Sequence, residues 1–313
     1  MSKIATRDAY GKALKKLGAE NKDIVVLDAD LSKSTKTSEF AAEFPQRFFN
    51  IGIAEANMMG TAAGLAAAGK IPFASTFAMF ATGRAFEQIR NSIAYTKLNV
   101  KIAASHAGLT VGEDGASHQA IEDISLMRSV PNMTVLVPSD GPETEACLRA
   151  AVEYKGPVYI RLGRPAVPVL HSEDYKITIG QAETMRDGKD ATVIATGIMV
   201  SMALEAAETL AGEGIFLRVI NMHTIKPLDA AAVIAAAQAT GAIVTAEEHN
   251  IIGGLGSAVA EVVVENHPVP MERVGVKDTF GESGLPDELL KKYGLTTADV
   301  VAAVKKVIGR KGC

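Results

Sequence analysis

The chain alternates short apolar runs, rich in β-branched residues, with longer stretches of helical periodicity, and this alternation limits its fold more than any other feature. In the first half, the apolar runs predict strands at residues 24–27, 101–104, 134–137 and 158–162. The periodic stretches predict helices at residues 8–17, 54–68, 83–95 and 142–154. Apolar strands joined by helices typically form a parallel sheet that is covered on both faces. We therefore predict an α/β fold.

A break in the alternation divides the chain. Residues 163–188 contain Pro165, Pro168 and many polar side chains, which are typical of a connecting segment. Beyond this segment the alternation resumes, with strands predicted at 192–196, 216–220 and 242–246 and helices at 200–212 and 229–239. A length of 313 residues allows two domains, each with its own core. We predict two three-layer α/β/α domains with mainly parallel sheets, at residues 1–165 and 189–313, joined by a linker at 166–188.

The composition argues against several classes of protein. A net charge of −4 with dispersed basic residues argues against a protein that binds nucleic acid. No run of about 18 apolar residues is present, so we expect no membrane span. The two cysteines, Cys147 and Cys313, cannot form a disulfide framework and fit a reducing compartment. We therefore expect a cytoplasmic globular protein.

The stretch FFNIGIAEANMMG (48–60) places one acid, Glu55, among small and apolar residues. Burial disfavours the charged form of a carboxyl group, which can then share a proton with a weakly basic nitrogen of a cofactor. Alternatively, Glu55 begins a helix, is favoured there by the helix dipole and is open to solvent. Spacing alone leaves both interpretations open.

Two further groups are candidates for a functional site. His106, Asp114 and His118 lie in the glycine-rich stretch SHAGLTVGEDGASHQAIED (105–123), but their spacing fits no standard zinc pattern, and we expect no metal ligand among them. A structural loop is the alternative interpretation. Phe77 and Phe80 lie three residues apart in STFAMF, a spacing that also results from simple core packing.

Taken together, FFNIGIAEANMMG, IPFASTFAMF (71–80), the 105–123 stretch and PNMTVLVPSD (131–140) resemble, in this order and spacing, the transketolase branch of thiamine diphosphate enzymes. The chain is similar to only the second half of a full-length transketolase. The missing first half normally binds the diphosphate and its divalent metal through a Gly-Asp-Gly motif, which does not occur here. The resemblance thus implies the pyrimidine-binding and C-terminal domains of a split transketolase. A separate N-terminal subunit would carry the diphosphate and Mg²⁺ site in an α2β2 assembly.

The resemblance implies thiamine diphosphate as the cofactor and gives four residues a role in binding it. Glu55 matches the glutamate that hydrogen-bonds a ring nitrogen of the cofactor's aminopyrimidine and thereby promotes proton loss from the thiazolium C2. Phe80 matches the main position that stacks on the pyrimidine, and Phe77 matches a supporting one. Asp30 matches an acid near the thiazolium, although a turn cap is equally compatible. Transketolases usually have an aromatic residue where this chain has Gly83, so the pocket is expected to be looser or differently filled.

The resemblance also implies a site for sugar phosphates. His106 is expected to contact the substrate phosphate, Asp114 to accept hydrogen bonds from donor hydroxyls, and His118 to lie near the reacting carbons. With Glu55, the two histidines form the expected catalytic set. An isolated arginine is usually solvated or salt-bridged, but the resemblance assigns the rest of the phosphate site to Arg7, Ser34 and Arg164.

The function that follows from this resemblance is transfer of a two-carbon ketol unit from a ketose phosphate to an aldose phosphate, as in the pentose phosphate pathway. The alternatives are a deoxyxylulose-phosphate synthase-like enzyme, which usually has an arginine at the position of His106, and a 2-oxo-acid dehydrogenase β-type subunit, whose substrate has no phosphate. A regulatory subunit without activity is a third alternative. For the second domain the resemblance implies a structural role, and we expect His249 to lie in a loop at a strand end.

Overall fold

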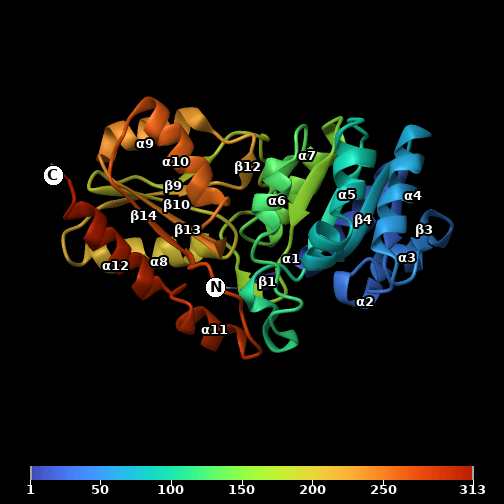
Figure 1. Cartoon of the computed structure of the whole chain (residues 1–313), viewed down its shortest axis with the longest axis horizontal. Helices are drawn as coiled ribbons and strands as arrows, with labels where there is room; N and C mark the ends of the chain where they lie inside the picture. Colours follow the sequence, from blue (N-terminus) through green and yellow to red (C-terminus); the bar gives the residue numbers. More distant parts are fainter. Residues whose placement is uncertain (1, 312–313) are drawn as a thin grey trace.

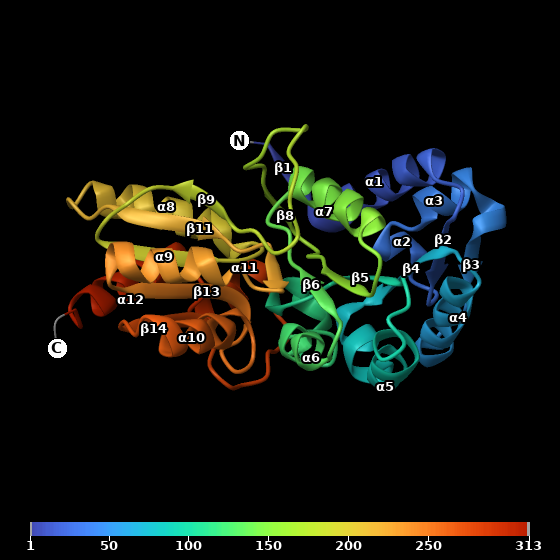
Figure 2. The same cartoon turned by 90° about the horizontal axis from the view of Figure 1, so that it is seen from above.

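The computed structural model describes residues 2–311 of the chain, and Cys313 lies outside the described residues. Two main sheets stand side by side, one formed mostly by the first half of the chain and the other by the second half (Figure 1). Helices cover both faces of each sheet (Figure 2). The predicted α/β class, with three layers and mainly parallel sheets, is confirmed.

The first sheet has seven strands in the order β12-β6-β7-β5-β4-β2-β3, and all are parallel except β12, which is antiparallel to β6. Its strands are β2 (Ile24–Asp28), β3 (Phe48–Asn50), β4 (Ile71–Phe77), β5 (Lys101–Ser105), β6 (Thr134–Leu136), β7 (Val158–Arg161) and β12 (Thr224–Lys226). Its helices include α1 (Thr6–Glu20), α2 (Ser32–Thr35), α3 (Ser38–Glu43), α4 (Glu55–Ala67), α5 (Phe86–Gln88), α6 (Asp123–Ser129) and α7 (Gly141–Glu153). Strand β12 belongs to the second half of the chain, so the two halves share this sheet.

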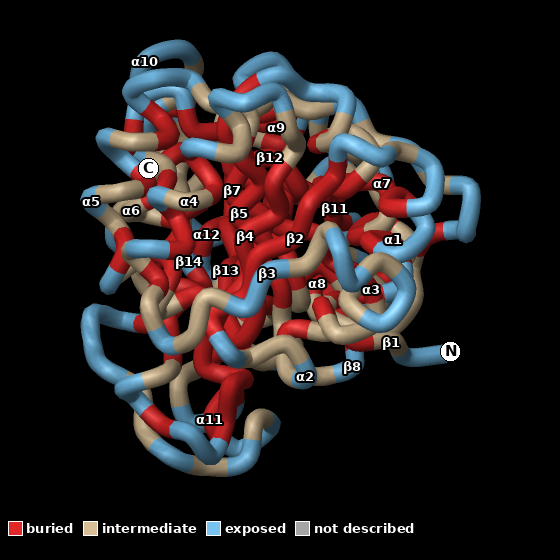
Figure 3. Tube along the Cα trace, turned by 90° about the vertical axis from the view of Figure 1, so that its right-hand side faces the viewer, coloured by how far each residue is buried: buried red, intermediate tan, exposed pale blue. Residues whose placement is uncertain are grey.

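Strand β2 shows why both faces of this sheet are covered. All five of its residues are buried, and successive side chains point to opposite faces. Val25 and Leu27 pack in the cluster that includes Met58 of α4, whereas Ile24 and Val26 pack in the cluster that includes Tyr10 of α1. The buried centre of the molecule follows these strands (Figure 3).

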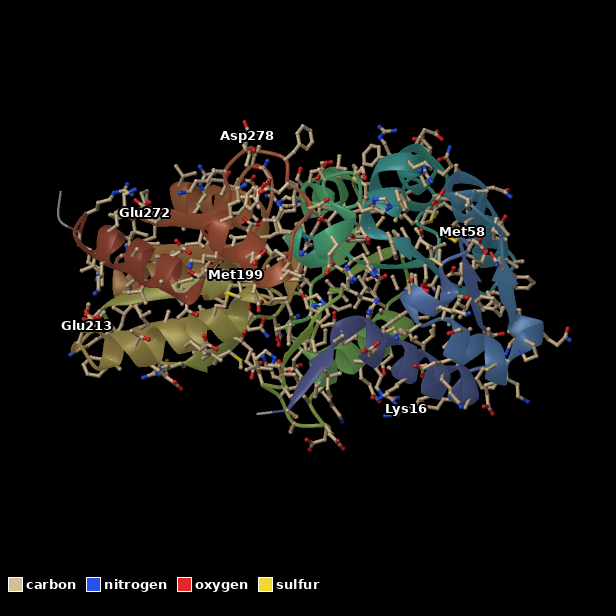
Figure 4. All side chains as sticks on the ribbon, turned by 90° about the horizontal axis from the view of Figure 1, so that it is seen from below. Lys16, Met58, Met199, Glu213, Glu272 and Asp278 are labelled. Atoms are coloured by element: carbon tan, nitrogen blue, oxygen red, sulfur yellow. The ribbon has the colours of Figure 1, made fainter. Side chains whose placement is uncertain are left out.

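The second sheet has five strands in the order β14-β13-β10-β11-β9, and only β9 is antiparallel to its neighbour. Its strands are β9 (Glu183–Arg186), β10 (Ala191–Ala195), β11 (Leu217–Asn221), β13 (Ile243–Asn250) and β14 (Met271–Val276). Its helices are α8 (Met199–Ala211), α9 (Ala230–Thr240), α10 (Leu255–Asn266), α11 (Pro286–Lys292) and α12 (Thr297–Ile308). Figure 4 labels Met58 and Met199, which are fully buried side chains of α4 and α8, one in each half.

Most predicted elements are confirmed, but the structure also contains strands that were not predicted, among them β3, β9 and β14. Strand β4 was not predicted, because Pro72 and a run of small residues weaken its β pattern. The regular helix predicted at 83–95 is wrong, since the chain is wound there mainly as two π-helical segments, η2 (Phe80–Arg84) and η3 (Ile89–Ala94). The connecting segment contains β8 (Ala166–Pro168), which pairs with β1 (Lys3–Ala5) near the start of the chain.

The carboxyl edge of the first sheet gathers the predicted site residues. Asp30 follows β2, Phe80 follows β4, and His106 follows β5, and these three strands are parallel neighbours. The carboxyl ends of parallel strands therefore meet at one edge, where ligands of α/β proteins commonly bind. No helix within residues 2–311 combines the length and the apolar character that crossing a membrane requires.

Candidate active site

Glu55 is the first residue of α4 and is buried, with only 1% of its surface exposed. The sequence left two interpretations of this acid, a buried carboxyl group or the first residue of a helix that is open to solvent. In the structure Glu55 is both buried and the first residue of a helix. The solvent-exposed version of that alternative is wrong. The buried Met58 and Met59 in the following turn, together with the sheet, exclude water from this end of α4.

Glu55 forms an ion pair with Arg84, which was not among the predicted site residues. The Nη1 atom of Arg84 lies 3.0 Å from Oε1 and 2.9 Å from Oε2 of Glu55. The guanidinium carbon lies 4.6 Å from the centre of the Phe80 ring, so the cation covers that ring as well. Half of the Arg84 side chain remains exposed. The charge of Glu55 is thus balanced by a side chain that can reach solvent.

The π-helical segment η2 explains why sequence reasoning missed Arg84. Phe80 and Arg84 begin and end this segment, which follows directly from β4 through Ala78 and Met79. A Cβ atom on Gly83 would lie 2.4 Å from the Met79 methyl group. The space expected for an aromatic residue at position 83 is therefore filled differently, by Met79. Segments of this kind are frequent at functional sites, but their geometry is not readable from local sequence.

Four predicted residues form one aromatic cluster. The rings of Phe77 and Phe80 are nearly parallel, with centres 6.0 Å apart. The His106 ring stacks on Phe77 with a centre distance of 3.8 Å, and the His118 ring meets Phe80 edge-on at 5.3 Å. These residues come from β4, η2 and the glycine-rich 105–123 stretch, so the fold brings together three segments that are separate in sequence. Phe80 and His118 are only half-buried, so these two side chains are not simply part of the hydrophobic core.

His106 is buried in a neutral form. It directly follows β5 with a φ of +58°, and its Nε2 lies 3.0 Å from Nη1 of Arg7. Arginine can only donate, so Nε2 accepts and the ring proton resides on Nδ1, which donates to the Ser105 hydroxyl at 2.8 Å. Burial, followed by the charges of Arg7 and Arg164, lowers the pKa of His106 to about 3.

Arg7 and Arg164 form a cationic cluster with His106. Arg7 donates to the backbone oxygen of Ser34 at 3.3 Å, while its Nε atom is buried without an acceptor among residues 2–311. Arg164 donates to the backbone oxygen of Val111 and to Oε2 of Glu113, 2.9 Å away. Burial lowers the pKa of Arg7, and the charge of Arg164 lowers it further, although Asp8 opposes this. An anion placed here would relieve the repulsion between the arginines and satisfy the unpaired Nε.

The remaining predicted residues lie at the rim. Asp30 has a φ of +64°, is exposed, and accepts a hydrogen bond from Asn50 Nδ2 at 3.0 Å. Asp114 is the exposed last residue of the 3₁₀ turn η4 (Leu109–Asp114). Nδ1 of His118 lies 2.9 Å from the Ser117 hydroxyl, and the side chain of Ser34 is partly exposed on α2. These side chains are open to solvent and available to a ligand.

A buried polar network that connects Glu248 of the second half of the chain to residues of the first half packs behind the glycine-rich stretch. Glu248 accepts the Thr110 backbone N–H at 2.6 Å, and its carboxyl carbon lies 2.3 Å from where a Cβ of Gly108 would be. Arg161 donates to Asp123 at 2.8 Å and to the backbone oxygens of Glu248 and Ala120. This network links β13 to β7 and α6 and fixes the segment that carries His106 and His118.

His249 also belongs to this region, and its predicted position is wrong. It lies within β13 and not in a loop, and it is completely buried. Its Nδ1 donates to the Asn250 backbone oxygen at 2.7 Å, and its Nε2 accepts from the Ser125 backbone N–H at 3.3 Å. Burial lowers the pKa of His249 to about 4, so it is a neutral structural residue.

Within the part of the chain that the structure describes, one group of three side chains has the spacing of metal ligands, namely Glu143, His171 and Glu183. His171 is already paired, with Nδ1 3.0 Å from Asp140 and Nε2 2.9 Å from Glu183. Burial opposes a charge on His171, but the close contact of its ring with Asp140 and the charge of Glu143 outweigh it and raise the pKa of His171 to about 9. A protonated histidine between carboxylates is a hydrogen-bonded cluster that joins α7 to the connecting segment and to β9.

Comparison with known proteins agrees with this geometry. The family model "Transketolase, pyrimidine binding domain" matches residues 2–169, and the model "Transketolase, C-terminal domain" matches residues 180–300. The chain belongs to the transketolase family. A 6-deoxy-6-sulfo-D-fructose transketolase subunit of a Clostridium species is 49% identical over 306 residues, covering 97% of this chain and 95% of that protein. Rat transketolase is 44% identical, and the alignment covers 98% of this chain but 49% of the rat protein.

Among solved structures, a split-gene transketolase described as an inactive β4 tetramer has 60% identity and a TM-score of 0.92. The alignment covers 99% of this chain and all of that one. The chain is therefore a C-terminal transketolase subunit by similarity, built from the pyrimidine-binding and C-terminal domains. These findings support neither the deoxyxylulose-phosphate synthase nor the 2-oxo-acid dehydrogenase alternative. Transketolases are thiamine diphosphate enzymes, so the family implies that cofactor.

Proposed function

We propose that this chain works with a separate N-terminal subunit to transfer a two-carbon ketol unit from a ketose phosphate to an aldose phosphate. The observation that carries the proposal is the position of Glu55, a buried carboxylate beside an aromatic cluster, next to a neutral histidine and two arginines. The proposed reaction needs an acid that can share a proton with the cofactor and a cationic site that binds the phosphate of the sugar.

The site fits the pyrimidine of thiamine diphosphate. Arg84, a planar group with N–H donors, covers the Phe80 ring and bonds to Glu55, so a flat ring with a similar donor suits the same space. Glu55 would hold a proton at a ring nitrogen of the cofactor, and Phe80 and Phe77 would orient the ring. Asp30, at the exposed rim, would lie near the thiazolium. When bound, the cofactor supplies the electron sink for breaking and forming the carbon–carbon bond.

The cationic cluster would bind the phosphate of the sugar. Arg7, with its unpaired Nε, and Arg164 would contact the phosphate oxygens, assisted by Ser34 and by the neutral His106. Asp114 would accept hydrogen bonds from donor hydroxyls, and His118 would lie near the reacting carbons. Since an ionised aspartate only accepts hydrogen bonds, Asp114 would select a substrate that carries hydroxyls.

The partner subunit would hold most of the diphosphate and the Mg²⁺ ion, in an α2β2 assembly in the cytoplasm. The lack of a Gly-Asp-Gly motif in this sequence supports this division of roles.

A sulfosugar is a second candidate donor. One close relative is named for 6-deoxy-6-sulfo-D-fructose, and a sulfonate presents three oxygens to Arg7 and Arg164 much as a phosphate does. A sulfonate carries less charge than a phosphate, so the same two arginines would discriminate between the donors by electrostatic attraction.

The test is ketol transfer by the chain mixed with its N-terminal subunit, thiamine diphosphate and Mg²⁺. Xylulose 5-phosphate and ribose 5-phosphate should give sedoheptulose 7-phosphate, and 6-deoxy-6-sulfo-D-fructose is tested as donor in parallel. Each subunit alone and the Glu55→Ala complex should form no product. An assembled, cofactor-loaded complex that accepts neither donor would show that the proposed reaction is wrong.

A further inference from the structure

The Arg84 side chain contacts both groups that a bound pyrimidine would need, the Glu55 carboxylate and the face of the Phe80 ring. Its Nη1 donates to both oxygens of Glu55, and its guanidinium lies over the Phe80 ring. Phe77 lies parallel to Phe80, and His118 contacts Phe80 edge-on, so other groups already pack around that ring. A pyrimidine that stacks on Phe80 and bonds to Glu55 must take the space that Arg84 fills.

We propose that Arg84 is an internal competitor of the cofactor, which neutralises Glu55 in the unloaded chain and must swing out before the pyrimidine can bind. The inference rests on the proposed function, because it assumes that Glu55 receives the pyrimidine. It adds a regulatory role for a residue of this chain, namely that the affinity for the cofactor is set partly by an ion pair that has to break.

The two members of the ion pair differ in their freedom to move. The Glu55 side chain is 1% exposed at the start of α4, whereas the Arg84 side chain is 51% exposed at the end of η2. Within residues 2–311, the side chain of Arg84 makes hydrogen bonds only to Glu55, and only through Nη1. The arginine can therefore rotate into solvent by breaking only this ion pair and its contact with the Phe80 ring, while the carboxylate stays in place to meet the incoming ring.

Arg84 has opposite effects in the free chain and in the loaded complex. In the free chain it stabilises the fold, because without it the buried Glu55 carboxylate loses its ion-pair partner. In the assembled complex it weakens cofactor binding, because the ion pair and the cation–π contact are lost when the ring enters. If Arg84 had a purely structural role, replacing it would lower both the stability of the free chain and the cofactor affinity of the complex. If it competes with the cofactor, replacing it lowers the stability but raises the affinity.

The test uses the complex with the N-terminal subunit in Mg²⁺ buffer, titrated with thiamine diphosphate by isothermal titration calorimetry. Arg84→Met should lower the Kd about five- to twentyfold, the combined strength of an exposed ion pair and a cation–π contact. Arg84→Lys should lie between this variant and the wild type, since it keeps the charge but not the flat guanidinium. The matched control is Arg90→Met, because Arg90 is exposed and its side chain hydrogen-bonds only to its neighbour Asn91 within residues 2–311.

Thermal unfolding of the free chain provides the second readout. Arg84→Met should lower its Tm, and adding Glu55→Gln to that variant should restore most of the loss. Equal or weaker cofactor binding by Arg84→Met, or by Arg84→Lys if the methionine variant does not assemble, would overturn the inference and leave the proposed function intact. A wild-type complex that binds no cofactor would instead overturn the proposed function, and this inference with it.

Discussion

Replacing Glu248 with alanine should impair ketol transfer, although this residue lies in the second half of the chain, behind the site. Its carboxylate accepts the Thr110 backbone N–H at 2.6 Å and packs directly against Gly108. These two residues lie between His106 and Asp114. Without the carboxylate, a buried N–H loses its acceptor, and the segment that carries the predicted substrate ligands loses its support.

The size of the effect follows from these contacts. A hydrogen bond to a charged group contributes about 1.5–3 kcal/mol, and an orphaned buried donor costs a similar amount. We therefore expect Glu248→Ala to reduce the free energy of unfolding by about 3 kcal/mol. A displacement of the His106 segment by about 1 Å would reduce kcat/KM by up to about a hundredfold. Glu248→Gln keeps an acceptor for Thr110 and should lose less than half as much.

The assay combines urea unfolding of the free chain with steady-state ketol transfer by the complex. Glu261→Ala is the control, because Glu261 is an exposed glutamate of the same domain whose ion pair with Arg128 should contribute about 0–1 kcal/mol. If Glu248→Ala lowered stability but left kcat/KM unchanged, Glu248 would support the fold without positioning the His106 segment.

Three further predictions concern other parts of the structure. Arg7→Met should raise the KM for the ketose phosphate about ten- to a hundredfold and change kcat little, and steady-state kinetics with an unchanged KM would contradict a phosphate contact. Gly108→Ala should lower the free energy of unfolding by more than about 2 kcal/mol, because its φ is +83° and the new Cβ would meet Glu248, whereas Gly64→Ala on the open face of α4 should be neutral or stabilising in urea unfolding. The pKa of His171 is raised to about 9, so its charged form stabilises the fold fully below about pH 6.5 and this contribution is lost as the pH rises through 9. The stability advantage of the wild type over His171→Gln should therefore shrink between pH 6.5 and 9, and a constant difference would count against the pairing with Asp140 and Glu183.

The sequence predicts the elements whose signal is local. Strand β2 and helix α7 are recognisable because their apolar spacing and, for α7, the Asp140 cap are contained within a few residues. The burial of Glu55 is different, because its local spacing left both a buried and a solvent-exposed position compatible with the sequence. The aromatic cluster and the cationic cluster were predicted only through family resemblance, since nothing in the spacing of Phe77, His106 and Arg7 requires them to meet.

The missed features depend on contacts between distant segments or on irregular backbone. Arg84 reaches Glu55 because the π-helical segment η2 directs it there, and no local pattern predicts that geometry. Glu248 and Arg161 lie 87 positions apart, and their network exists only once β13 packs behind the glycine-rich stretch. His249 was assigned to a loop because polar residues at the end of an apolar run usually mark one, but here the strand continues through them.

If Glu55 activates the cofactor as proposed, exchange of the thiazolium C2 proton should depend on its carboxyl group. The exchange rate of bound thiamine diphosphate would be measured by NMR in the assembled complex, for the wild type and for Glu55→Gln. A glutamine fills the same space but cannot share a proton, so exchange should slow about a hundred- to ten-thousandfold while the cofactor remains bound. An exchange rate equal to that of the wild type, at full cofactor occupancy, would show that Glu55 does not activate the cofactor.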